Sequence, residues 1–161
     1  MSTLSQWEMI ERLVVALILG ALLGFERERR DKPAGIRTYA LVCEGSALFM
    51  MGSLLLGETV RAAGGFGYDP SRIGSTIVQG IGFLAGGVIL ARGTSVRNLT
   101  TAAGIWVTAA IGLLIGGGFF FLGIAATIAT AVVLVPLKWV EDWVAPRGHP
   151  QPPSSEQTSS D

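Results

Sequence analysis

The chain has 161 residues, of which 50% are hydrophobic and 15% are charged. A soluble domain typically carries about 25% charged residues to cover its surface, so this composition argues against a soluble enzyme and favours an integral membrane protein. The 12 basic and 12 acidic residues balance, which argues against a nucleic-acid-binding protein that depends on phosphate attraction. Cys43 is the only cysteine, which excludes an intrachain disulfide.

The first apolar run predicts a membrane-spanning helix. Residues 13–25 are apolar, and the helix reaches the length of about 20 residues that a bilayer requires if residues 7–12 form its outer end. The charged segment 26–32 ends this span. The Pro33-Ala34-Gly35 sequence then predicts a turn, which is followed by a second span at 38–56.

Three further spans are predicted in the rest of the chain. A polar, glycine-rich loop at 58–71 precedes a third span at 73–90, and a short polar turn follows at 92–98. The apolar run 99–135 is roughly twice the length of one span. Because Gly116-Gly117-Gly118 interrupts this run, we expect two helices joined by a tight glycine turn.

These segments predict an all-α bundle of five transmembrane helices in residues 1–145, followed by a tail at 146–161. The tail is rich in proline and polar residues and is therefore expected to be disordered. An odd number of spans places the two termini on opposite sides. By the positive-inside rule, the N-terminus is expected outside and the C-terminal tail in the cytoplasm. Nine of the 12 basic residues fall on the side that is thereby expected to face the cytoplasm: Arg27, Arg29, Arg30, Lys32, Arg37, Arg92, Arg97, Lys138 and Arg147.

Glycines inside the apolar runs predict close helix packing. Small residues let membrane helices approach one another, and Gly20 and Gly24 have the required spacing of four residues. The third span carries a second such pair, Gly82 and Gly86, together with Gly80 and Gly87. Chance spacing in a glycine-rich chain is the competing explanation. Residues 80–85 also match a dinucleotide-binding pattern. We reject that match because the pattern lies within an apolar span and no acidic residue follows at the required distance, so no cofactor is expected.

Glu44 is a carboxylic acid in the middle of the second predicted span. An ionised carboxylate facing lipid is costly, so this side chain must face the bundle, pair with a cation or stay protonated. One interpretation is an ion or proton site. The alternative is a structural glutamate that hydrogen-bonds to a neighbouring helix or extends toward the interface.

A second group of candidate residues lies at the cytoplasmic ends of the predicted helices. Glu26 ends the first span, and we expect it to pair with Arg37 or Arg97 and so to close this end of the bundle. Either Asn98 or Thr100 is expected to cap the fourth helix. Thr101 is expected to hydrogen-bond to the backbone or to a neighbouring helix. Capping and packing are the simpler explanation for these last three residues.

Four motifs in this chain resemble the successive signatures of the MgtC/SapB family. The first motif is the 20–24 glycine pair followed by Phe25-Glu26-Arg27, and the second is Pro33-Ala34-Gly35-Ile36-Arg37-Thr38. The other two are residues 80–84 (GIGFL) and 99–103 (LTTAA), the latter followed by Trp106. The motifs occur in the family's order, and the resemblance extends from about residue 7 to residue 136. It implies that Glu26, Arg37, Thr100 and Thr101 are functionally sensitive positions.

The resemblance also implies a function. Family members are bacterial inner-membrane proteins linked to growth at low magnesium, to pathogen survival in host cells and to inhibition of the ATP synthase. We therefore expect a non-enzymatic modulator of membrane energetics or magnesium homeostasis that lies in the lipid bilayer, forms a homo-oligomer and acts through another membrane protein, such as the ATP synthase. The alternative is a small cation or proton transporter that uses Glu44 and the Glu26/Arg37 cluster. Mg²⁺ usually needs only one or two protein carboxylates, so a single Glu44 is compatible with that alternative.

Overall fold

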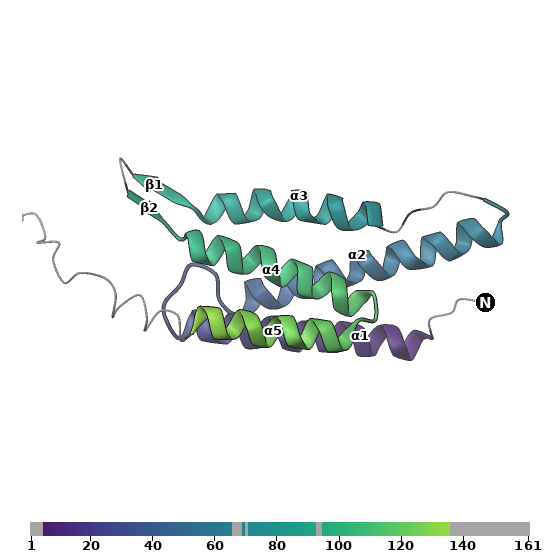
Figure 1. Ribbon diagram of the computed structural model, residues 1–161, viewed down its shortest axis with the longest axis horizontal. Coiled ribbons are helices and arrows are strands. Elements are labelled where there is room, and N and C mark those ends of the chain that lie inside the picture. The colour runs from purple at the N-terminus through teal and green to yellow at the C-terminus, as the bar shows by residue number, and fades with distance from the viewer. Residues whose placement is uncertain (1–4, 66–68, 70, 93–94, 136–161) are drawn as a thin grey trace, which may run out of the picture.

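The structure is a computed structural model that describes residues 5–65, 69, 71–92 and 95–135. These residues form five helices that run side by side along the long axis of the molecule (Figure 1). Their bounds are α1 (Gln6–Glu28), α2 (Ile36–Ala62), α3 (Ser71–Val88), α4 (Leu99–Gly116) and α5 (Phe120–Leu134). The predicted all-α bundle of five helices is confirmed. The predicted tail at 146–161 lies outside the described residues.

The glycine turn between the last two helices lies where the sequence predicts it. The helix α4 ends at Gly116, and Gly118 adopts a positive φ of 87° that favours glycine. Phe119 is the N-cap residue of α5, which begins at Phe120. The turn makes α4 and α5 antiparallel neighbours in the bundle (Figure 1).

Two predicted connections differ from the structure. The helix α2 continues to Ala62, so the loop predicted to begin at residue 58 begins later. Polar side chains mark the edge of the hydrocarbon layer, whereas the helix itself extends beyond that edge. The predicted polar turn at 92–98 is largely a β-hairpin, in which β1 (Leu90–Arg92) pairs antiparallel with β2 (Ser95–Arg97).

The core lies where α1, α2 and α4 meet. Small residues allow close contact between these helices, and several larger side chains fill the remaining space. The most deeply buried residues of the core are Ala16, Tyr39, Cys43, Ala47, Ile105, Ala109, Ile111 and Ile115. The helix α3 packs mainly on α4 and has fewer contacts with α2.

Large apolar side chains cover the outside of the bundle. Phe121 is 88% exposed, Phe83 84% and Trp7 81%, which is the pattern expected where hydrocarbon, and not water, surrounds the protein. By length and composition, α2 and α4 are each able to cross a membrane. The bundle is therefore a membrane helix bundle.

The helix ends sort into two groups at opposite ends of the bundle. One end contains the α1–α2 connection, the hairpin and the C-terminal end of α5 (Figure 1). The opposite end contains the start of α1, the end of α2 and the turn between α4 and α5 (Figure 1). The first end is called the basic end below, because the sequence places most of the basic residues there.

Candidate functional site

A buried arginine lies at the basic end of the bundle. Only 4% of the Arg27 side chain is exposed, although the residue lies in the last turn of α1. The buried residues of α1 follow the helical repeat and form one stripe: Ala16, Leu19, Gly20, Leu23, Gly24 and Arg27. The stripe that packs on α2 and α4 therefore ends in a guanidinium group.

Arg27 and Tyr39 connect three helices through residue 101. The Arg27 Nη2 atom donates a hydrogen bond of 3.1 Å to the hydroxyl oxygen of Thr101 in the first turn of α4. The Tyr39 hydroxyl, from the first turn of α2, donates to the carbonyl oxygen of Thr101 at 3.4 Å. Thr101 is 1% exposed and Tyr39 is fully buried. These three residues form a buried polar cluster that joins α1, α2 and α4.

Glu26 lies beside this cluster and pairs with its neighbour in α1 and with Arg30 in the turn that follows the helix. Its carboxylate contacts the Arg30 Nε atom at 2.5 Å and the Arg27 Nη1 atom at 3.6 Å. Among the described residues, neither carboxylate oxygen accepts a hydrogen bond of good geometry, so both contacts are ionic. The predicted pairing of Glu26 with Arg37 or Arg97 is wrong, because Arg30 in the turn directly after α1 already reaches the Glu26 carboxylate.

The remaining candidates at this end lie outside the polar cluster. Arg37 and Thr100 are exposed. Asn98 occupies the N-cap position of α4 with a positive φ of 69°, but its side chain makes no capping hydrogen bond. Its Nδ2 atom donates instead to the carbonyl oxygen of Val88 at 3.1 Å. The prediction that Asn98 or Thr100 caps α4 is therefore wrong, and Asn98 connects the start of α4 to the end of α3.

A carboxylate on α1 caps the second helix. The Glu28 Oε2 atom accepts a hydrogen bond of 2.8 Å from the backbone N–H of Ile36, the first residue of α2. The N-cap residue, Gly35, has no side chain that could do this. Because helix N-termini attract negative charge, Glu28 satisfies a free N–H and complements the helix dipole. Sequence analysis missed this role because the two residues lie on opposite sides of a turn.

Glu44 lies on α2, about 12 Å along the helix from its first residue. It is partly buried and forms no hydrogen bond or ion pair with the residues that the structure describes. It is not part of the polar cluster at the basic end. In residues 5–65, 69, 71–92 and 95–135, no group of three or more His, Cys, Asp or Glu side chains is arranged to hold a metal ion.

Gly20 and Gly24 lie at the closest approach of α1 to α2. A Cβ atom at Gly20 would lie 2.5 Å from the carbonyl oxygen of Tyr39, and one at Gly24 would lie 2.6 Å from the Cα of Ile36. Neither position accommodates a side chain without movement of the backbone of α2. The spacing of four residues keeps both glycines on the same face.

A second close approach, between α2 and α4, was not predicted. A Cβ atom at Gly112 would lie 2.8 Å from the Cβ of Ser46, and one at Gly116 would lie 2.6 Å from the carbonyl oxygen of Ala47. A Cβ atom at Gly104 would likewise clash with the Tyr39 hydroxyl oxygen. The signal was present in the sequence, since Gly112 and Gly116 have the same spacing as the glycine pair in α1.

The four glycines singled out in α3 lie in a different environment. A Cβ atom at Gly80, Gly82, Gly86 or Gly87 would meet no other part of the described chain within 4 Å. Packing of these glycines on neighbouring helices of the same chain is therefore not observed. They leave parts of the α3 surface open instead.

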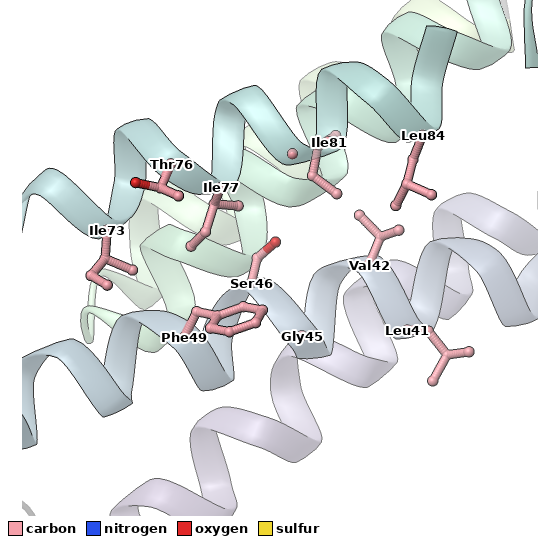
Figure 2. A pocket seen from close by; sticks show the side chains of 11 residues that line it. Leu41, Val42, Gly45, Ser46, Phe49, Ile73, Thr76, Ile77, Ile81 and Leu84 are labelled. Carbon is pink, nitrogen blue, oxygen red and sulfur yellow. The ribbon is translucent and has the colours of Figure 1, made fainter. Parts of the chain in front are cut away.

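An apolar groove lies between α2 and α3. It has a volume of about 580 Å³ and contains both Gly45 and Gly80. Figure 2 shows side chains from the two helices on either side of it, including Val42 and Phe49 from α2 and Ile77 and Leu84 from α3. Because the polar groups of its lining are hydroxyls, the groove suits a hydrocarbon chain or apolar side chains better than a hydrated ion.

Comparisons with known proteins identify the family. The family model described as the MgtC family matches residues 13–143. The chain is 47% identical over 127 residues to the Escherichia coli K12 protein called "Putative magnesium transporter YhiD", covering 79% of this chain and 59% of that protein. It is 45% identical over 119 residues to Protein MgtC of Salmonella typhimurium LT2, covering 74% of this chain and 48% of that protein.

A cyanobacterial protein, slr0014 of Synechocystis, is 42% identical over 134 residues, covering 83% of this chain and 54% of that protein. The chain thus spans about half the length of the curated relatives it matches. No solved structure matches it. The match over residues 13–143, together with the membrane helix bundle, establishes that this chain belongs to the MgtC family.

Proposed function

We propose that this chain is a non-enzymatic modulator in the bacterial inner membrane that acts on magnesium homeostasis or membrane energetics by binding another membrane protein. The α2/α3 groove is the observation that carries this proposal. It is apolar, has a volume of about 580 Å³ and lies on the outside of the α1, α2 and α4 core. A transmembrane helix of another protein is able to place apolar side chains in such a groove without disturbing the core.

The relatives support the link to magnesium. YhiD has a provisional name that attributes magnesium transport to it, and Protein MgtC belongs to the same family as this chain. Both relatives are longer than the matched region, which covers 59% of YhiD and 48% of Protein MgtC. We propose that the membrane domain provides the docking function, with the N-terminus outside and the basic end in the cytoplasm, where the positive-inside rule places it.

Filling the groove tests the docking function. The variants Gly45→Leu and Gly80→Leu add side chains that point toward space with no described atom within 4 Å, so the bundle is expected to fold. We expect each to abolish the ability of the chain to restore growth of a deletion strain at low magnesium, and to reduce co-purification of an inner-membrane protein such as an ATP-synthase subunit. Gly52→Leu is the matched control, since Gly52 also lies in open surroundings on α2 but does not line the groove.

Growth of the groove variants and of the control decides whether docking uses this groove. Full growth with both groove variants, at wild-type protein levels in the membrane, contradicts docking through this groove. Loss of growth with Gly52→Leu as well would show that any enlargement of α2 is harmful and would remove the support for the groove.

Transport is the second candidate function, and Glu44 is the observation that favours it. This carboxylate lies within α2 with no described partner, and intramembrane ionisable residues commonly mark ion or proton pathways. A transporter would use Glu44 within the membrane and the Glu26–Arg30 pair at the basic end. This alternative predicts cation or proton flux that falls when Glu44 is replaced by glutamine.

A further inference from the structure

One face of α3 carries polar and small residues and points away from the rest of the chain. Ser75, Gln79, Gly82 and Gly86 follow one another at intervals of four, three and four residues, which places them on a single face of the helix. All four are exposed. The name "Gln79 face" is used for these four residues.

The Gln79 face is distinct from the surfaces that α3 already uses. Ile81 and Ala85 are buried, and α3 packs mainly on α4. Gly80 and Leu84 line the groove toward α2 (Figure 2). A Cβ atom at Gly82 or Gly86 would meet nothing within 4 Å, so nothing in the described chain covers the Gln79 face.

Gln79 lies at the middle of α3, within the membrane helix bundle. It is the ninth of the 18 residues of α3, so it lies about 12 Å from the first residue and about 13 Å from the last along the helix axis. Its side-chain amide makes no hydrogen bond with any described residue. Ser75 differs, because its hydroxyl donates to the carbonyl oxygen of Arg72 at 2.8 Å.

An unpartnered amide halfway along a helix of a membrane bundle requires a partner that lipid does not supply. Hydrocarbon tails neither donate nor accept hydrogen bonds, and transferring an amide into them without a hydrogen bond is unfavourable. Two glycines on the same face allow another helix backbone to approach closely. The Gln79 face therefore presents an amide without a hydrogen-bond partner and enough space for a second helix to bring one.

We propose that the Gln79 face binds the same face of a second copy of this chain. A primary amide contains both a donor and an acceptor, so two glutamines related by a two-fold axis are able to satisfy each other. A two-fold interface brings identical surfaces together, which makes the partner amide available without any further sequence requirement. This pairing goes beyond the proposed docking function, because it uses the side of α3 opposite to the α2/α3 groove and leaves that groove open.

Oxidative cross-linking in native membranes tests the pairing. The full chain carries Cys43→Ala, which removes its single thiol, and one new cysteine as Ser75→Cys, which keeps both glycines of the Gln79 face. We expect covalent dimers from this variant on mild oxidation. The matched control is Leu84→Cys on the groove side of the same helix, where 54% of the leucine side chain is exposed, and it is expected to give few dimers.

The glutamine is tested by a second substitution in the Ser75→Cys chain. Gln79→Leu is expected to lower the dimeric fraction by at least about threefold, given typical strengths of polar contacts between membrane helices, and Gln79→Asn is expected to restore part of it. Each variant is first checked for detergent extraction as a monodisperse helical protein.

Two results overturn the pairing. One is equal cross-linking at Leu84→Cys and Ser75→Cys, which would indicate random collision and does not depend on any change at Gln79. The other is an undiminished dimer in a folded Gln79→Leu chain. Because growth at low magnesium with the Gly45→Leu and Gly80→Leu variants reports on the groove alone, failure of the pairing is distinguishable from failure of the proposed function.

Discussion

The Arg27 guanidinium at the end of α1 donates a hydrogen bond of 3.1 Å to the Thr101 hydroxyl in the first turn of α4, across 74 positions of sequence. The guanidinium is buried at the end of the stripe that forms the core. Because Tyr39 donates to the carbonyl oxygen of the same threonine, the contact fixes α1, α2 and α4 relative to one another at the basic end.

Removing the Thr101 hydroxyl is expected to destabilise the bundle. Thr101→Val keeps the shape of the side chain but leaves a buried guanidinium nitrogen without its acceptor, which typically costs about 1.5–3 kcal/mol. Thermal unfolding in detergent, followed by circular dichroism, measures the loss. Thr101→Ser retains the hydroxyl and is expected to lose less stability, and equal losses in the two variants would mean that the hydrogen bond contributes little.

The close approach of α1 to α2 predicts opposite effects at two glycines. A Cβ atom at Gly20 would lie 2.5 Å from a backbone oxygen of α2, so Gly20→Ala is expected to cost about 1–3 kcal/mol through overpacking. Gly52→Ala adds the same methyl group where no described atom lies within 4 Å. It is expected to be neutral or to stabilise by up to about 1 kcal/mol through helix propensity. Midpoints of thermal unfolding compare the two, and a tolerated Gly20→Ala would contradict the close approach.

Arg12 is expected to stabilise the end of α4. Its Nη1 atom donates to the carbonyl oxygen of Gly116 at 2.7 Å, where a cation complements the negative end of the helix dipole. Arg12→Gln is expected to cost about 1 kcal/mol and to increase hydrogen exchange in the last turn of α4. Glu11→Gln, at the exposed neighbouring position, serves as the control and is expected to leave exchange there unchanged.

Glu28 is expected to protect the first turn of α2. Glu28→Ala removes the acceptor for the Ile36 N–H and is expected to cost about 0.5–2 kcal/mol, as other cap deletions do. Amide hydrogen exchange resolved by residue should show faster exchange at Ile36. Unchanged protection at that amide would mean that water replaces the carboxylate without loss.

The number of helices was predictable because hydrocarbon demands long apolar segments. The break at Gly116–Gly118 was also predictable, since a run of twice the span length must turn. The end of α2 at Ala62 was not, because polarity reports where the membrane ends and a helix is free to extend into the headgroup region. The hairpin was missed because each strand has only three residues, too few for a pattern of alternating polarity.

The candidate site was only partly predictable. Glu26 was correctly singled out as an ion-paired residue, but its partner is Arg30 and not Arg37, as their spacing of four residues across the end of α1 would have indicated. The burial of Arg27 follows from its position on the stripe of Leu19 and Leu23. Its contact with Thr101 depends on how α1 and α4 pack, which no local pattern specifies.

Ion flux tests the central claim most directly. Purified full-length chain in liposomes that contain a magnesium-sensitive dye is compared with protein-free liposomes and with the Glu44→Gln variant at equal protein-to-lipid ratio. A modulator that acts by docking predicts Mg²⁺ entry equal to that of protein-free liposomes, with no change in the variant. Entry well above that level, lost in Glu44→Gln, would contradict docking and establish transport.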